Sequence, residues 1–408
     1  MTSPKPGAIF VSYNGLLDPL GASQVLPYVE RLAKDRPMSI VSFERQERMH
    51  PATMNVMRER LLSQGIVWRR LTYRRQPSLF AKALDLWDGV RAVRGLLTRQ
   101  RSLIHARGYV SMEIASRATR AHPILFDIRG LQGEEYVDAG HWTTHDVRYL
   151  LLKTAERRFF RRAAGAVVLT KAIEPYVREK FAHLGRTPPL EVIPSAVALD
   201  RFYFDQAERD EVRNRLNLED RLVFVYSGSL GSWYLADEMA GFVRAFADRV
   251  GRSVALLWLV NGDQADAERA SLRARLTRAE TRIATATASE MRPYLAAADV
   301  GLALIKACFS KRSSSPTKYG EYLAVGMPVV MTREVGDSAL LESWGGGIAV
   351  DHPLDEGRVG MVCDRLVHLI QRPRAHFRAI AYDHFDIETV AIPAYRRLYE
   401  ELLSTADG

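Results

Sequence analysis

The chain has 408 residues, 47% of them hydrophobic and 26% charged, which predicts a globular protein with two domains that each bury a core. Its 57 Lys and Arg residues exceed its 48 Asp and Glu residues, giving a net charge of +9. A basic balance of this size suits partners that carry phosphate: nucleic acid, an anionic membrane surface or phosphorylated substrates.

Cysteine content and apolar runs exclude several classes of protein. Cys308 and Cys363 are too far apart for a metal or redox motif, and the absence of a disulfide framework suits a reducing compartment. No signal peptide is predicted, and no apolar run approaches the ~18 residues that span a bilayer. We find neither zinc-finger spacing nor an aromatic RNA-binding strand, so no nucleic-acid partner is expected. These features predict a cytoplasmic protein that is not integral to a membrane.

Strands and helices are expected to alternate along the chain. Apolar runs predict strands in the first half at residues 8–12, 39–42, 103–105, 124–127 and 166–169, with a helix over about 22–34. After a polar stretch near 200–220 the pattern restarts, with strands expected at 222–226, 255–260, 300–305 and 329–331. Continuous apolar strands separated by helices predict an α/β protein with two doubly wound parallel sheets, which bind ligands at the carboxyl ends of their strands.

The segment from Ser313 to Val330 carries the most informative pattern, a loop followed by a short helix and a buried strand. Ser315 is expected to be the N-cap of the helix and Pro316 its first residue. Lys318 then lies in the first turn, where a cation opposes the helix dipole unless an anion also binds. A hydroxyl cap and an ammonium at a helix N-terminus predict a phosphate site. The alternative is that Lys318 simply pairs with Glu321, three residues later.

This segment resembles the donor-binding signature of family 4 glycosyltransferases with the GT-B fold. The matching residues run Ser315-Pro-Thr-Lys-Tyr-Gly-Glu-Tyr-Leu-Ala-Val-Gly-Met-Pro-Val-Val330. The resemblance implies that Glu321 holds the ribose of a nucleotide-sugar. It also implies that the helix start, with Ser315, Pro316, Thr317 and Lys318, faces the diphosphate. Ser313 stands where the family often has a second glutamate that contacts the transferred sugar.

The likeness extends over nearly the whole chain. Further similar segments are Gly15–Pro27, His105–Tyr109, Phe126–Glu135, Leu169–Lys171 and Val192–Val197. The resemblance implies two Rossmann-like domains facing a cleft, an acceptor-binding domain at 1–195 and a nucleotide-sugar-binding domain at 196–385. A C-terminal helix in 386–408 is expected to pack back on the first domain.

The loop from Gly228 to Tyr234 is expected to lie beside the donor phosphates. Many relatives carry an arginine and a lysine there, but this loop has no positive charge. Gly228, Ser229 and Gly231 are expected to offer backbone N–H groups to phosphate, unless the glycines only form a turn. Gly21 and Asp18, in the first loop of the chain, are expected near the donor phosphates and the acceptor; the alternative for Asp18 is a solvated turn residue.

On the acceptor side, Asp127 and Arg129 follow a buried strand and are expected to reach the ligand. The alternative is that they pair with each other inside the protein. His105 also ends a strand, and its alternative role is that of a hydrogen-bonded core residue. Glu134 and Glu135 are placed in a glycine-flanked loop that reaches the acceptor.

We therefore interpret the chain as a retaining glycosyltransferase, independent of metal and cofactor by resemblance. It would move a sugar from a nucleotide-sugar to a hydroxyl of a glycan, lipid-linked or small-molecule acceptor. Asp127, assisted by His105 or Glu135, would orient or deprotonate that hydroxyl. The alternatives are a sugar-nucleotide epimerase or glycogen-type phosphorylase of the same fold, and a non-catalytic nucleotide-sugar-binding subunit of a membrane assembly.

A basic cluster on a predicted helix suggests peripheral contact with the inner face of the cell membrane. Arg157, Arg158, Arg161 and Arg162 surround Phe159-Phe160. Such a helix is expected to lie on anionic lipid with its aromatic side chains dipping in. The alternative is a solvated helix whose apolar stripe packs on its own domain.

Overall fold

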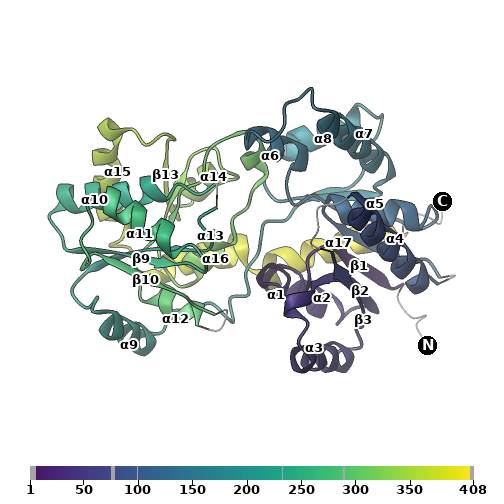
Figure 1. The fold of residues 1–408 in the computed structure, drawn as a ribbon, viewed down its shortest axis with the longest axis horizontal. Helices are drawn as coiled ribbons and strands as arrows, with labels where there is room; N and C mark the ends of the chain where they lie inside the picture. Colours follow the sequence, from purple (N-terminus) through teal and green to yellow (C-terminus); the bar gives the residue numbers. More distant parts are fainter. Residues whose placement is uncertain (1–5, 75–78, 99, 232, 288–289, 405–408) are drawn as a thin grey trace. The chain divides into compact units, whose positions relative to one another are not determined.

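The computed structural model describes residues 6–74, 79–98, 100–231, 233–287 and 290–404. The chain divides into two compact units, which are described separately (Figure 1). Unit 1 comprises Met1–Pro194 and Val390–Gly408, and unit 2 comprises Ser195–Thr389. Residues 386–389, expected with the C-terminal helix, belong to unit 2, whereas helix α17 (Ile392–Ser404) belongs to unit 1.

Unit 1 is built on a seven-stranded parallel sheet with the order β3-β2-β1-β4-β5-β6-β7. Its strands are β1 (Ala8–Ser12), β2 (Met38–Arg45), β3 (Val67–Tyr73), β4 (Leu103–Arg107), β5 (Ile124–Asp127), β6 (Gly165–Val168) and β7 (Leu190–Val192). The central strands are continuously apolar because both faces of the sheet are covered.

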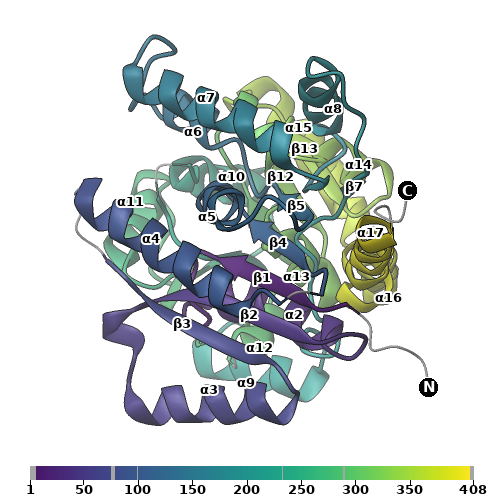
Figure 2. The same cartoon turned by 90° about the vertical axis from the view of Figure 1, so that its right-hand side faces the viewer.

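The helices of unit 1 lie on both faces of this sheet. They are α1 (Pro19–Gln24), α2 (Leu26–Leu32), α3 (Pro51–Ser63), α4 (Leu79–Leu96), α5 (Tyr109–Ala118), α6 (Gln132–Asp138), α7 (Val147–Arg162), α8 (Glu174–Ala182) and α17. Side chains of α4, α5, α7 and α8 form one core cluster with alternate residues of β1, β4, β5 and β6. Helices α2 and α17 pack together on the other face (Figure 2), so residues such as His105 point toward α17.

Unit 2 contains a six-stranded parallel sheet with the order β10-β9-β8-β11-β12-β13. Its strands are β8 (Leu222–Ser227), β9 (Val254–Leu259), β10 (Thr281–Ala284), β11 (Val300–Ala303), β12 (Val329–Thr332) and β13 (Gly347–Val350). Its helices are α9 (Gln206–Leu216), α10 (Ala236–Val250), α11 (Gln264–Arg273), α12 (Met291–Ala296), α13 (Thr317–Ala324), α14 (Ser338–Ser343), α15 (Glu356–Leu369) and α16 (Arg374–Phe385). Two core clusters, one on each face, confirm the predicted doubly wound arrangement.

The helix expected over residues 22–34 is two helices instead. Helices α1 and α2 meet at Val25, whose φ of −126° and ψ of −59° depart from helical values. Pro27 explains the interruption, because its ring has no N–H to donate and it is tolerated only in the first turn of a helix.

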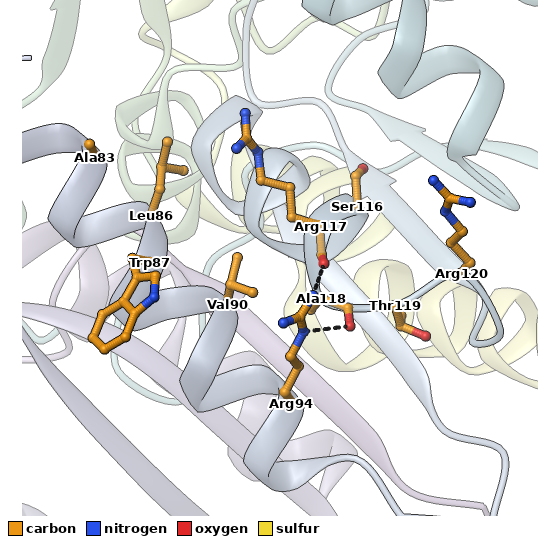
Figure 3. Close-up of a pocket in the computed structure, with 10 residues that line it drawn as sticks. All are labelled: Ala83, Leu86, Trp87, Val90, Arg94, Ser116, Arg117, Ala118, Thr119 and Arg120. Atoms are coloured by element: carbon orange, nitrogen blue, oxygen red, sulfur yellow. Dashed lines mark hydrogen bonds between the residues drawn. The ribbon is translucent and has the colours of Figure 1, made fainter.

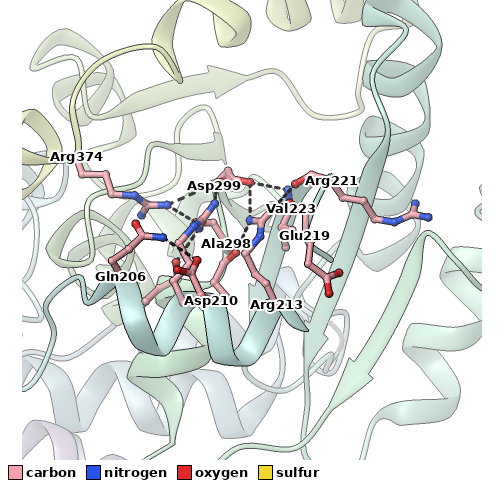
Figure 4. Close-up of polar contacts among 12 residues, drawn as sticks. Gln206, Asp210, Arg213, Glu219, Arg221, Val223, Ala298, Asp299 and Arg374 are labelled. Carbon is pink, nitrogen blue, oxygen red and sulfur yellow. Dashed lines mark hydrogen bonds and ion pairs between the residues drawn. The ribbon is translucent and has the colours of Figure 1, made fainter. Parts of the chain in front are cut away.

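The carboxylate of Asp299 connects several elements at the amino-terminal side of the unit 2 sheet (Figure 4). Asp299, directly before β11, accepts from the backbone N–H of Val223 at 2.8 Å. It also pairs with Arg209 at 2.6 Å and Arg213 at 3.3 Å, and both guanidinium groups donate to carbonyls at the end of α12. This network links α9, α12 and β8 on the side of the sheet opposite the carboxyl ends of its strands.

Within the described ranges, we find no helix that combines the length and the apolar character needed to cross a membrane.

Candidate functional site

The carboxyl edge of the unit 2 sheet brings together the predicted donor-binding residues of that unit. Strands β8 and β11 are parallel neighbours, so the loop after β8 and the segment that leads from β11 to α13 leave the same edge. Lys318, in the first turn of α13, reaches the start of the β8 loop. Its ammonium nitrogen would lie 3.7 Å from a Cβ atom placed on Gly228.

Lys318 is buried against aromatic rings. The residue is only 7% exposed, and its nitrogen lies 4.2 Å from the ring centre of Tyr234 and 5.1 Å from that of Tyr226. Among the described residues, no carboxylate oxygen comes within 4.0 Å of it, so the alternative pairing with Glu321 is not observed. An ammonium held at a helix N-terminus without an anion is unfavourable. The site is therefore suited to a ligand that brings negative charge.

Glu321 lies on the same helix, one turn after Lys318, and is half-buried. Its carboxylate makes no hydrogen bond or ion pair with any residue in the described part of the chain. Burial raises the pKa of this carboxyl, and the charges of Lys318 and Arg201 oppose that shift. Its oxygens therefore keep their capacity to accept hydrogen bonds from a ligand, such as those of two neighbouring hydroxyls.

The start of α13 differs from the expected cap. Pro316 is the N-cap residue and Thr317 the first helical residue, so the prediction that Ser315 caps the helix is wrong. The Ser315 hydroxyl instead accepts from the backbone N–H of Ser195 at 3.0 Å. Because Pro316 has no N–H, the backbone donors at this helix end belong to Thr317 and Lys318.

Backbone contacts decide which N–H groups of the β8 loop remain available. Gly228 has a φ of +122°, which suits glycine, and its N–H donates to Leu259 O at 3.0 Å. The N–H of Leu230 donates to Asp263 at 2.8 Å. In the described part of the chain no acceptor faces the N–H of Ser229 or Gly231. Only these last two fit the predicted role as phosphate donors.

Asp127 and His105 belong to a buried network in unit 1. His105 is 0% and Asp127 1% exposed. The Nε2 atom of His105 lies 3.2 Å from Asp127 Oδ2, and its Nδ1 lies 2.7 Å from the hydroxyl of Tyr399 on α17. Tyr395, also on α17, donates to Asp127 Oδ2 at 3.3 Å, and Arg129 lies 3.5 Å from Oδ1. These contacts match the alternative interpretation, in which Asp127 and Arg129 pair with each other inside the protein.

Charge in this network disfavours Asp127 as a general base. Burial alone would raise the pKa of its carboxyl, but Arg129, His105 and Arg107 together hold that pKa at about 2. Burial lowers the pKa of His105, so its ring is neutral near neutral pH. A carboxylate with so low a pKa is a weak proton acceptor. The catalytic roles of Asp127 and His105 remain predictions.

Glu134 and Glu135 lie in helix α6, and the prediction that they form a loop is wrong. Glu134 is buried and accepts from Lys153 at 2.8 Å, with the hydroxyls of Tyr149 and Tyr176 at 3.5 and 3.4 Å. Glu135 is half-buried beside Gly130, with its Oε1 3.4 Å from a Cβ atom placed on that glycine. Of the two, Glu135 is the more accessible.

The first loop of unit 1 is held by a carboxylate that we did not predict from the sequence. Glu44, at the end of β2, is buried and accepts from the N–H groups of Leu16 at 2.8 Å and Leu17 at 3.1 Å. A charge at the carboxyl end of an apolar strand was the signal that could have revealed it. Asp18 pairs with Arg45 at 3.5 Å and with Arg48 at 3.7 Å, so it is not a solvated turn residue.

Gly21 is required by close packing. A Cβ atom at this position would lie 1.8 Å from the carbonyl oxygen of Gly15. This contact requires a glycine at position 21 whether or not a ligand binds. The role of Gly21 near phosphate stays a prediction.

Metal ligands are not grouped in the described part of the chain, where no cluster of three or more His, Cys, Asp or Glu residues could hold an ion.

Comparison with known proteins shows the fold. No protein-family model matches the chain, and no curated protein matches it in sequence. Among solved structures, Anabaena HepE in complex with UDP and glucose is 15% identical with a TM-score of 0.70, covering 97% of this chain and 100% of that one. A glycosyltransferase from Rickettsia africae is 12% identical with a TM-score of 0.67, over 98% and 100%. WaaG, a glycosyltransferase involved in lipopolysaccharide biosynthesis, is 13% identical with a TM-score of 0.64, over 98% and 100%. The predicted fold class, GT-B, is confirmed.

Proposed function

We propose that this protein is a glycosyltransferase that uses a nucleoside diphosphate sugar as donor. The observation that carries the proposal is the pair of charged groups on α13. Among the described residues, the buried ammonium of Lys318 meets no anion at ion-pair distance, and the carboxylate of Glu321, one turn later, meets no hydrogen-bond donor. A nucleoside diphosphate supplies what each lacks, because its phosphates are anionic and its ribose carries two hydroxyl donors.

In the proposed mechanism the chain stabilises the departing diphosphate. Negative charge grows on the phosphate as the bond to the sugar breaks. Lys318 and the N–H groups of Thr317, Ser229 and Gly231 would stabilise that charge electrostatically. The resemblance to family 4 enzymes supports retention of the anomeric configuration and transfer without a metal. The acceptor would be a hydroxyl of a glycan, a lipid-linked glycan or a small molecule, oriented by unit 1 with Glu135 as the accessible carboxylate.

The donor assignment is tested by thermal unfolding with UDP, GDP, ADP, TDP and CMP, on the wild type and on Glu321→Ala. A ligand at about 100 times its dissociation constant adds about 2.7 kcal/mol, which shifts the midpoint by a few degrees. We expect one nucleoside diphosphate to stabilise the wild type, and the shift to be lost in the variant. Thr317→Val is a matched control that keeps the backbone N–H group and should keep the shift. Absence of a shift with every nucleotide would refute the donor site.

A non-catalytic nucleotide-sugar-binding subunit is the second candidate. Ser313, at the position of the family's second glutamate, is buried and its hydroxyl donates to Ser310 O at 2.5 Å. Because residue 313 is a serine, it offers no carboxylate to the transferred sugar. Release of nucleoside diphosphate that depends on an added acceptor separates an enzyme from a binding subunit. Conversion of the donor sugar without any acceptor would identify the epimerase alternative.

We also propose that unit 1 touches an anionic membrane, but through different side chains from those expected. Phe159 and Phe160 are buried in the core, so the prediction that they dip into lipid is wrong. Arg162 donates to the carbonyls of Thr119 and His122. Arg157, Arg158 and Arg161 remain exposed on α7.

A groove between α4 and α5 supports membrane contact (Figure 3). It encloses about 910 Å³ and is lined by Arg94, Arg117 and Arg120, with Leu86 and the exposed Trp87 on its apolar side. Guanidinium groups beside an exposed indole suit an anionic lipid headgroup and the acyl boundary below it.

The membrane proposal is tested by flotation with vesicles. We expect binding to phosphatidylglycerol vesicles, little binding to phosphatidylcholine alone, and a strong loss in Trp87→Ala/Arg120→Gln. Arg269→Gln, which removes an exposed arginine of unit 2, is the matched control. Equal binding to both kinds of vesicle, or unchanged binding of the double variant, would exclude this surface.

A further inference from the structure

The β8 loop carries no cation of its own, yet it contacts two lysines that come from another segment. Trp233 and Tyr234 are neighbours at the end of this loop. The ammonium of Lys311 lies 3.9 Å from the ring centre of Trp233, and that of Lys318 lies 4.2 Å from the ring centre of Tyr234. Both lysines belong to the stretch between β11 and α13 or to the first turn of α13, and both are less than one-tenth exposed.

Backbone contacts fix these two aromatic residues to the carboxyl end of β11. The N–H of Lys306 donates to Trp233 O at 2.8 Å, and the N–H of Leu235 donates to Leu304 O at 3.0 Å. Tyr234 forms an isolated antiparallel bridge with Ile305. The rings therefore have defined positions at the edge of the sheet where the donor is proposed to bind.

An aromatic face is a particular kind of partner for an ammonium. It attracts the cation through the negative face of the ring, but it carries no net charge and accepts no conventional hydrogen bond. A carboxylate in the same place would neutralise the lysine and occupy its N–H groups. The ring of Tyr234 holds the Lys318 ammonium in place and leaves its charge available for an anion.

We infer that Tyr234 is a positioning residue that holds Lys318 against the diphosphate of the donor. The inference rests on the proposed function and deepens it. Lys318 supplies positive charge that the β8 loop lacks, and the loop supplies the ring that fixes it. The ligand recognised by the pair is a diphosphate group, whichever base and sugar it carries.

The inference is tested by a double-mutant cycle on Tyr234 and Lys318, with UDP and inorganic pyrophosphate as probes in titration calorimetry. Tyr234→Leu should weaken binding about three- to tenfold, and Tyr234→Phe, which keeps the ring, should bind like the wild type. In a Lys318→Met background, Tyr234→Leu should have little further effect, because the lysine that it positions is gone.

A purely structural role for the rings predicts a different result. The losses from Tyr234→Leu and Lys318→Met would then add. Tyr382→Leu, which removes an exposed tyrosine of unit 2, controls for loss of an aromatic side chain and should leave binding unchanged. If the wild type binds UDP and the losses add, the inference fails while the donor site stands. If the wild type binds neither UDP nor pyrophosphate, both fail.

Discussion

Two charged side chains on α13 are expected to destabilise the ligand-free protein. Lys318 is buried against aromatic rings, and Glu321 is half-buried; neither meets an opposite charge at ion-pair distance in the part of the chain that the structure describes. Such strain is characteristic of binding sites, where preorganised groups meet their partners only in the complex. Removing either charge should therefore stabilise the free protein and weaken the complex.

Glu321→Gln separates these two effects. Burial raises the pKa of the Glu321 carboxyl above its usual 4.5. The folded state therefore binds the proton more tightly than the unfolded state, and stability is lost as the pH rises through that raised pKa. Glutamine does not ionise, so the ligand-free variant should unfold at a higher temperature than the wild type at pH 7, with the difference vanishing toward pH 4. UDP affinity should fall about ten- to a hundredfold through loss of charged hydrogen bonds.

Thermal unfolding of both proteins from pH 4 to 8, with and without UDP, measures the two effects. A Gln variant that is less stable than the wild type at pH 7 would show that the carboxylate already has a stabilising partner. Glu388→Gln, on the same unit, provides a comparison at a carboxylate outside the proposed site.

At the scale of single residues, the sequence identified Lys318 and Glu321 because a helix start and a Gly-x-Pro ending are local signals. Tyr226 and Tyr234 were not identified as partners of Lys318. They are 92 and 84 residues away along the chain, and only the pairing of β8 with β11 brings them to it. Asp127 does end strand β5, but the prediction that His105 ends a strand is wrong, because His105 is the middle residue of β4. The contacts of both residues with α17 join positions more than 250 residues apart in sequence.

At the scale of elements, the strands that the sequence analysis missed are the outer strands of the two sheets: β3 and β7 in unit 1, and β10 and β13 in unit 2. An outer strand has one neighbour, and it needs no continuous apolar run. Strand β3 has the sequence VWRRLTY, and none of its residues is buried. Its two arginines also place charge at the open edge of the sheet. Strand β13 is buried but has only four residues, including Gly347. The central strands were predictable because helices cover both of their faces.

At the scale of the whole molecule, each unit has a core and a polar network of its own, so the units should unfold in separate calorimetric transitions. UDP, bound at the proposed site on unit 2, should raise one transition only. Asp127→Asn should lower the other, because Arg129 and His105 lose the buried carboxylate that faces them, and loss of one partner of a buried pair costs about 3–5 kcal/mol.

The variant Asp127→Asn also decides whether Asp127 is a catalytic residue or only supports the fold. If the aspartate only supports the fold, the transfer rate per folded molecule should stay within a few-fold of the wild type at a temperature below both transitions. A catalytic aspartate would instead lose most of its turnover there while the calorimetric shift stays as predicted. Tyr399→Phe removes the hydroxyl that lies 2.7 Å from His105 and disturbs the same network without altering its charge, so it should lower the unit 1 transition less. A single transition that UDP raises as a whole would contradict the independence of the two cores.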